Sequence, residues 1–144
     1  MRFGAGIAWT ITSAAMKLID TDVAIDHFHG HRAALDFLAG IIAAGEVVAV
    51  SVVTIAEIMG GMRTGEEQRT ERLLQMFLVL EATDPIARRA GECPRQFRRI
   101  HGIDLGDALI AATAREHSAE LVTRNAKHYP MTDLAINVPY ERGR

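Results

Sequence analysis

One stretch organises the rest of this chain: Lys17-Leu18-Ile19-Asp20-Thr21-Asp22-Val23-Ala24-Ile25-Asp26. Its first half is a short apolar run that stops at an acid, which is the pattern of a buried parallel strand with a carboxylate at its carboxyl end. Ligands of open α/β sheets bind beyond the carboxyl ends of the strands, so Asp20 lies where chemistry is expected. A carboxylate near the core needs hydrogen bonds or a metal ion to hold its charge.

Strands and helices alternate along the chain on both sides of this stretch. The predicted strands are 17–20, 46–51, 78–82, 120–123 and 134–138. The predicted helices are 23–29 with Asp22 as N-cap, 31–44 ending at Gly45, 54–62, 66–77, 84–100 with Asp84 as N-cap and a kink or interruption at Pro94, and 104–118. This alternation predicts a single doubly wound α/β domain, with a mainly parallel five-stranded sheet flanked by helices.

Residues 1–15 precede the first predicted strand and are only weakly apolar. Glycine, serine and threonine interrupt the apolar run and only one arginine precedes it, so a signal peptide fits poorly. Met16 stands directly before the strand and would be the better start of the protein. We therefore expect 1–15 to be a disordered N-terminal extension, 16–140 to be the folded domain and 141–144 to be a tail.

Size and composition limit the possible functions. The 144 residues suffice for one domain with a sizeable core, and 49% of them are hydrophobic. The formal net charge of −2 gives no global attraction to nucleic acid, so such binding would need a local patch. The single cysteine, Cys93, excludes an internal disulfide and a multi-cysteine zinc site and is compatible with the cytoplasm. No apolar run is long enough to suggest a membrane partner.

Four polar residues lie at or near the ends of the predicted strands: Asp20, Glu57, Asp107 and Asn125. The fourth strand can lie beside the first, where the connections change direction, and the second strand can flank the first on its other side. These four residues would then meet in one crevice. Carboxylates gathered there would raise one another's pKa, and a hard divalent cation with oxygen ligands would remove that conflict.

Each of these residues also has an ordinary structural explanation. Asp20 could be a hydrogen-bonded acid at a strand end, and Glu57 could be a solvent-facing helix residue. Asp104 and Asp107 are spaced as N-cap and N3, so both could favour the amino end of a helix. We expect the capping role for Asp104, and for Asp107 this role is compatible with metal binding.

The motifs around these residues resemble those of the PIN-domain ribonucleases, and most closely the VapC-type toxins of type II toxin–antitoxin systems. The matching segments are 18–26, 50–58, 102–114 and 121–129, so the resemblance covers nearly the whole chain. Asp20, Glu57 and Asp107 stand on acids of the family's first three motifs. Asn125 stands where many members carry an acid, although asparagine is also found there.

The resemblance implies a metal-dependent endoribonuclease that cuts RNA with water activated by Mg²⁺ or Mn²⁺. It implies that Asp20 and Asp107 bind the metal and that Glu57 binds it or orients the attacking water. Asn125 would hold a water carried by the ion, or the substrate phosphate. The candidate substrate contacts or supporting groups nearby are Arg124, Thr21 and Thr123. A homodimer and inhibition by a VapB-like antitoxin are implied as well.

Two other functions remain open from the sequence. The Asp20-Thr21-Asp22 segment also fits the Asp-x-Asp motif of haloacid-dehalogenase-type phosphatases, in which the first acid is a nucleophile. That family needs a later lysine followed by an acid pair, whereas Lys127 follows Asp107 and no adjacent acid pair comes after it. The other function is a degenerate, non-catalytic PIN-like RNA-binding module, in which Asn125 marks the loss of an acid.

Overall fold

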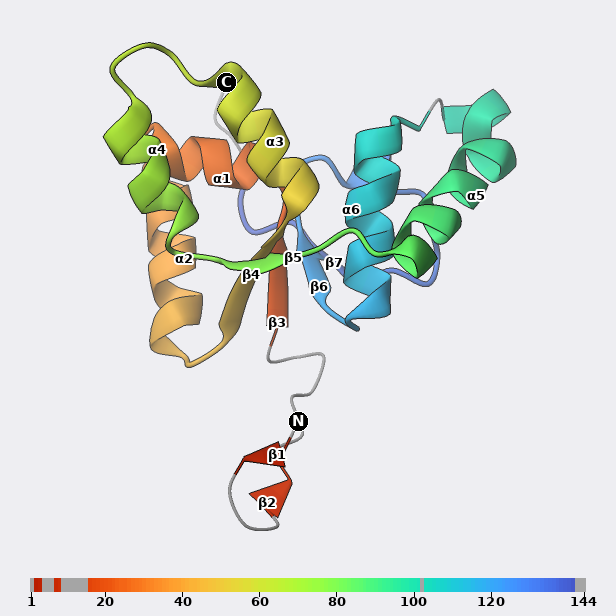
Figure 1. Cartoon of the computed structure of the whole chain (residues 1–144), viewed down its shortest axis with the longest axis horizontal. Coiled ribbons are helices and arrows are strands. Elements are labelled where there is room, and N and C mark those ends of the chain that lie inside the picture. The colour runs from red at the N-terminus through yellow and green to blue at the C-terminus, as the bar shows by residue number, and fades with distance from the viewer. Residues whose placement is uncertain (1, 4–6, 9–15, 102, 142–144) are drawn as a thin grey trace.

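A five-stranded parallel sheet lies between helices in the computed structural model, which describes residues 2–3, 7–8, 16–101 and 103–141 (Figure 1). Its strands are β3 (Met16–Ile19), β4 (Val47–Ser51), β5 (Leu78–Leu80), β6 (Glu120–Val122) and β7 (Ile136–Asn137). They lie in the order β5-β4-β3-β6-β7, and all their pairings are parallel. This confirms the predicted fold class and places β3 between β4 and β6.

The helices cover both faces of this sheet. They are α1 (Thr21–Phe28), α2 (Arg32–Ala43), α3 (Val52–Gly61), α4 (Glu67–Leu74), α5 (Asp84–His101) and α6 (Leu105–Glu116). Helices α1, α2 and α4 lie on one side of the strands, and α5 and α6 lie on the other (Figure 1). Among the helices that the structure describes, none has the length and apolar character needed to cross a membrane.

Alternate side chains of β3 pack into two separate hydrophobic cores, as expected for a strand that is buried on both faces. Leu18 packs in the core formed with α5 and α6, whereas Ile19 packs in the core formed with α1, α2, α3 and α4. Leu121 and Val122 of β6 divide in the same way. The next residue after Ile19 is Asp20, which therefore leaves the sheet at its carboxyl edge.

Helix boundaries differ from the predictions at three amino ends. The N-cap of α1 is Asp20, whose side chain accepts a hydrogen bond from the Thr21 N–H, and not Asp22. Helix α3 begins two residues before the predicted 54 because the Ser51 hydroxyl caps it. The Thr83 hydroxyl accepts a 3.4 Å hydrogen bond from the Ile86 N–H, so Thr83, rather than Asp84, occupies the capping position of α5.

Two predicted helix features concern the carboxyl half of α5 and the end of α2. Helix α5 runs from Asp84 to His101 without the predicted interruption at Pro94. Helix α2 ends as predicted, because Gly45 adopts a φ of 79° and its N–H donates to the Ile42 carbonyl.

The chain ends are described only in part. Two short strands, β1 (Arg2–Phe3) and β2 (Ile7–Ala8), pair antiparallel. The other residues of the predicted extension 1–15, and residues 142–144 of the predicted tail, lie outside the described residues.

Candidate active site

A cleft of about 240 Å³ lies beyond the carboxyl ends of β3 and β6, where the strand order changes direction. The residues that line it come from four separate parts of the chain: Asp20, Thr21, Asp22, Ile25, Glu57, Asp107, Asn125 and His128. All four predicted catalytic residues therefore face one cleft, as the topology argument required, and the candidate Thr21 lies with them.

Asp20 is buried at this edge of the sheet and is held by three donors. Its backbone N–H donates to the Val122 carbonyl of β6 at 2.8 Å, which fixes where the side chain begins. Oδ1 accepts from the Thr21 N–H at 2.8 Å, and Oδ2 accepts from the hydroxyls of Thr123 at 2.8 Å and Tyr129 at 2.9 Å. Hydrogen bonds to a charged acceptor are strong, so the direction of this carboxylate is set before any ligand arrives.

Tyr129 connects Asp20 to Asp107 and was not among the predicted site residues. Its hydroxyl lies 2.9 Å from Oδ2 of Asp20 and 3.4 Å from Oδ1 of Asp107. Burial, and then the charges of Asp20 and Asp107, raise the pKa of Tyr129, so its hydroxyl stays protonated and remains a donor. Tyr129 ends the fourth motif segment, but its role becomes visible only when that segment is placed against β3.

Asp107 lies in the first turn of α6 and carries a perturbed carboxyl group. Helix α6 begins after Asp104, whose side chain accepts from the Gly106 N–H at 2.6 Å, which confirms the predicted cap. Burial, followed by the charges of Asp20 and Asp104, raises the pKa of Asp107 to about 6. His128 acts in the opposite direction, with Nδ1 at 3.7 Å from Oδ2 of Asp107.

Glu57 approaches the cleft from α3 and is tied to the start of α1. Its Oε1 accepts a 2.8 Å hydrogen bond from the Thr21 hydroxyl. The buried Thr54, one turn earlier in α3, has its hydroxyl 3.0 Å from the same Thr21 oxygen. Thr21 therefore orients Glu57, and this contact joins the helices that follow β3 and β4.

Asp22 is a further cleft residue, which the sequence predicted as a helix cap or as the second acid of an Asp-x-Asp phosphatase motif and not as part of the nuclease site. Its Oδ2 accepts from the Asn125 side-chain amide at 2.9 Å and from the Arg124 N–H at 3.1 Å, and its Oδ1 accepts from the Val23 N–H at 2.7 Å. Burial, and then the charge of Asp20, raise the pKa of Asp22 to about 6. The Asp-x-Asp spacing was the available signal, because it places a second carboxylate beside the first at the start of α1.

Two of the three candidate substrate contacts lie away from the surface of the cleft. Thr123 is fully buried, accepts from the Asn125 N–H at 3.1 Å and donates to Asp20. Nε of Arg124 lies 2.8 Å from Oδ2 of the buried Asp26, in an ion pair that lacks hydrogen-bond alignment. The Tyr140 hydroxyl donates to the same Asp26 oxygen at 2.9 Å. This placement favours an anchoring role for Arg124 over the predicted phosphate contact.

The donor set of the cleft suits a hard divalent cation. Asp20, Asp22, Glu57 and Asp107 offer carboxylate oxygens to one space, and burial, followed by the charge of Asp20, raises the pKa of Asp22 and of Asp107. Within the described part of the chain, however, no group of three or more acidic, histidine or cysteine side chains is already arranged so that it could hold a metal ion. The fit to a divalent ion therefore rests on the chemistry of these oxygen donors, and waters and a ligand would have to complete the coordination.

Comparison with known proteins identifies the class of this fold and site. The family model for the PIN domain matches residues 17–133, which include every predicted catalytic residue. The chain belongs to the PIN-domain family.

Individual relatives match most of their own length. Ribonuclease VapC10 of Mycobacterium tuberculosis is 50% identical over 117 residues, which cover 81% of this chain and 87% of that protein. Ribonuclease VapC19 of the same organism is 42% identical over 117 residues, covering 81% of this chain and 94% of the relative. Among solved structures, a toxin–antitoxin complex from Klebsiella pneumoniae has a chain that is 32% identical, with a TM-score of 0.71, over 88% of this chain and 99% of that one.

Proposed function

We propose that this protein is an endoribonuclease that uses Mg²⁺ or Mn²⁺, and that it is the toxin of a VapBC-type toxin–antitoxin pair. The observation that carries the proposal is the convergence of Asp20, Glu57 and Asp107 on one cleft at the switch point of the sheet. The relatives named ribonucleases support the activity, because they share 42–50% identity over 117 residues, or 81% of this chain. An RNA substrate supports the cytoplasm as the proposed location of the activity.

A cation is needed for RNA to enter this cleft. Four carboxylates line it, and a phosphodiester carries a further negative charge, so substrate and site repel each other without a counter-ion. When bound, the divalent ion supplies an activated water and stabilises charge on the phosphate oxygens. Asp20 and Asp107 would hold it, since they face each other through Tyr129.

The chain's own residues then fix the geometry of the reaction. Asp20 keeps its direction through Thr123 and Tyr129, and Glu57 keeps its direction through Thr21. Glu57 enters from α3 and can accept the proton of the attacking water, whereas Asp107 enters from α6. Asn125 holds Asp22 in place through its side-chain amide. If the water attacks the phosphorus and the bond from phosphorus to the 3′ oxygen breaks, the products carry a 5′-phosphate and a 3′-hydroxyl.

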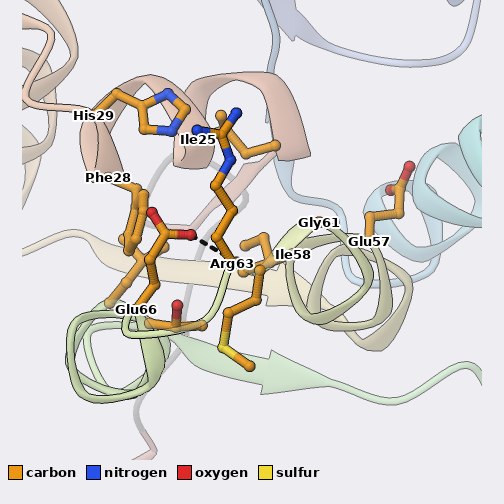
Figure 2. A pocket seen from close by; sticks show the side chains of 11 residues that line it. Ile25, Phe28, His29, Glu57, Ile58, Gly61, Arg63 and Glu66 are labelled. Carbon is orange, nitrogen blue, oxygen red and sulfur yellow. Dashed lines mark hydrogen bonds between the residues drawn. The ribbon is translucent and has the colours of Figure 1, made fainter.

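The antitoxin has a candidate docking groove beside the cleft. A pocket of about 150 Å³ lies among α1, α3 and α4, with Glu57 at one end and Phe28 and His29 at the other (Figure 2). Ile58 and Leu73 contribute apolar surface to its lining. Because Glu57 lines both this groove and the catalytic cleft, an apolar antitoxin segment bound here would also cover the active site. The Klebsiella pneumoniae structure is of a toxin–antitoxin complex, which supports a protein inhibitor for this chain.

The proposed homodimer has a candidate surface on the edge strand of the sheet. Leu78 and Val79 of β5 are exposed apolar side chains on a strand that pairs only with β4 within the described sheet. A second copy would cover this edge and these side chains.

Expression in bacteria tests the toxin assignment. Induction of the wild-type protein without its antitoxin should arrest growth, and Asp20→Asn and Asp107→Asn should each relieve the arrest because each removes a cleft carboxylate. The matched control is Asp36→Asn, which makes the same change on the exposed side of α2 and should still arrest growth. Growth arrest by both cleft variants, at wild-type expression and with native circular dichroism, would overturn the proposed site.

A further inference from the structure

His128 stands out in the cleft because its chemistry differs from that of its neighbours. It is the one histidine among the described residues that line this cleft, and the other ionisable residues of the lining are four acids. No role in the proposed hydrolysis has been assigned to it so far. Its side chain is 50% exposed, so it is accessible to a ligand in the cleft and has room to adjust.

Backbone contacts fix the position of His128 at the edge of the cleft. It ends the 3₁₀ helix Ala126–His128, and its N–H donates to the Asn125 carbonyl at 2.9 Å. The next residue, Tyr129, is buried and bonded to Asp20. The backbone of His128 is therefore fixed beside the catalytic cleft, while its imidazole stays half exposed.

The spacing between His128 and Asp107 suits a shared cation better than a direct bond. Nδ1 of His128 lies 3.7 Å from Oδ2 of Asp107, which is too long for a hydrogen bond. Two atoms that bind one ion at roughly 2.1 Å can be at most about 4.2 Å apart. The observed distance lies within this limit, and a small rotation of the half-exposed imidazole can shorten it.

We propose that His128 is a ligand of the catalytic metal, with its imidazole nitrogen placed beside the carboxylate of Asp107. This assignment rests on the metal-dependent function proposed above. It has a consequence for metal choice, because imidazole is a softer donor than carboxylate and binds the later transition metals better than it binds Mg²⁺. The site should therefore prefer Mn²⁺ to Mg²⁺ more strongly than a site built from carboxylates alone.

The competing role for His128 is that of a positive charge that offsets the surrounding acids. The two roles predict opposite changes in metal binding. Removing a positive charge with His128→Gln would make the cleft more negative and strengthen the binding of Mg²⁺ and Mn²⁺ alike. Removing a nitrogen ligand would weaken the binding of Mn²⁺, and would weaken that of Mg²⁺ less.

Pulsed electron paramagnetic resonance of bound Mn²⁺ tests the assignment directly. Wild-type protein should show modulation from a directly bound nitrogen, and His128→Gln should lose it. The control His117→Gln, an exposed residue at the end of α6, should keep it. Mn²⁺ affinity should fall by roughly tenfold or more in His128→Gln, as ligand-sphere changes typically do. Absence of the nitrogen signal from the wild type, or its persistence in His128→Gln, would overturn the proposal.

Parallel assays of RNA cleavage separate this proposal from the one on which it rests. Cleavage that needs Mn²⁺ or Mg²⁺ but shows no nitrogen signal would overturn the role of His128 and leave the ribonuclease assignment intact. A nitrogen signal that depends on His128, in a protein that cuts no RNA, would support the ligand and overturn the ribonuclease.

Discussion

At the scale of single residues, the segment that follows β6 acts mainly as a set of donors for the acids of the first motif. The Thr123 and Tyr129 hydroxyls donate to Asp20, and the Asn125 amide donates to Asp22. This gives Asn125 a role that does not require it to replace a metal-binding acid. Its side-chain nitrogen donates a hydrogen bond to the Asp22 carboxylate, which an ionised acid at position 125 could not do because it has no donor.

The first residue-scale prediction follows from that donor role. Asn125→Asp would place an acceptor where the amide now donates to Oδ2 of Asp22 at 2.9 Å, whereas Asn125→Ala would only remove the donor. Without metal at pH 7.5, Asn125→Ala should lower the free energy of unfolding by about 1–3 kcal/mol, and Asn125→Asp should lower it further. Urea unfolding of the three proteins provides the measurement.

A second test of the hydrogen bond from Asn125 to Asp22 is how the stability difference between Asn125→Asp and Asn125→Ala changes with pH. The pKa of Asp22 is raised to about 6 in the folded protein, from an ordinary value of 3.8. The protonated carboxyl is therefore favoured by folding, and this contribution to stability is lost as the pH rises through about 6. The difference in the free energy of unfolding between Asn125→Asp and Asn125→Ala should therefore be smaller at pH 5 than at pH 7.5. Equal stability of both variants at both pH values would show that the amide does not donate to Asp22.

Sequence reasoning identified the cleft acids better than it identified the groups that hold them. Asp20, Glu57 and Asp107 were predicted because each acid has a recognisable place relative to a strand or helix. Tyr129 and the side-chain contacts of Asp22 were missed, since they join residues about a hundred positions apart. Only the pairing of β3 with β6 brings these partners together.

At the scale of elements, α1 organises both the cleft and its support. Asp20 caps the helix, and Asp22 and Asp26 lie four residues apart on the same face. Asp22 contacts the Asn125 amide, and Asp26 contacts the Arg124 side chain. One helix thus fixes the catalytic carboxylate and clamps the segment that follows β6.

The prediction at this scale concerns the clamp formed by Asp26. Its side chain is 2% exposed and that of Arg124 is 22% exposed, so Asp26→Asn would leave a largely buried arginine without its counter-charge. The free energy of unfolding should fall by about 3–5 kcal/mol. Tyr140→Phe removes only one hydrogen bond to Asp26 and should cost less, about 1–3 kcal/mol. Equal losses for the two variants in urea unfolding would contradict the clamp.

The sequence predicted the elements more accurately than their ends. Apolar runs located every strand of the main sheet, because buried parallel strands are continuous in apolar residues. The amino ends of α1 and α3 were placed late, since Asp20 and Ser51 serve both as strand-end residues and as helix caps. When one residue both ends a strand and caps the next helix, the apolar pattern shows the strand end but not the cap.

At the scale of the whole molecule, topology explains why distant motifs form one site. Strands β3 and β6 are neighbours in the sheet but lie about a hundred residues apart in the sequence. The connection from β3 to β5 includes α1, α2 and α4 on one side of the strands, and the connection from β5 to β6 includes α5 and α6 on the other side (Figure 1). The cleft lies beyond the carboxyl ends of β3 and β6, between these two layers. The prediction that β6 lies beside β3 was therefore sufficient to predict the cleft.

The net charge of −2 is a second reason to expect that the site needs a metal ion. The protein has no overall positive charge to attract RNA, and its cleft is lined by carboxylates. A divalent ion is then the part of the site that makes a polyanionic substrate acceptable. Metal dependence is for this reason the central claim about the molecule.

Cleavage of a defined RNA by the purified protein, with the product ends identified, tests this claim most directly. We predict cleavage in Mn²⁺ or Mg²⁺, 5′-phosphate and 3′-hydroxyl ends, complete loss in EDTA, and loss in the folded Asp107→Asn variant. Cleavage that continues in EDTA and leaves cyclic 2′,3′-phosphate ends would contradict the account, because it would show attack by the RNA's own 2′-hydroxyl without a metal.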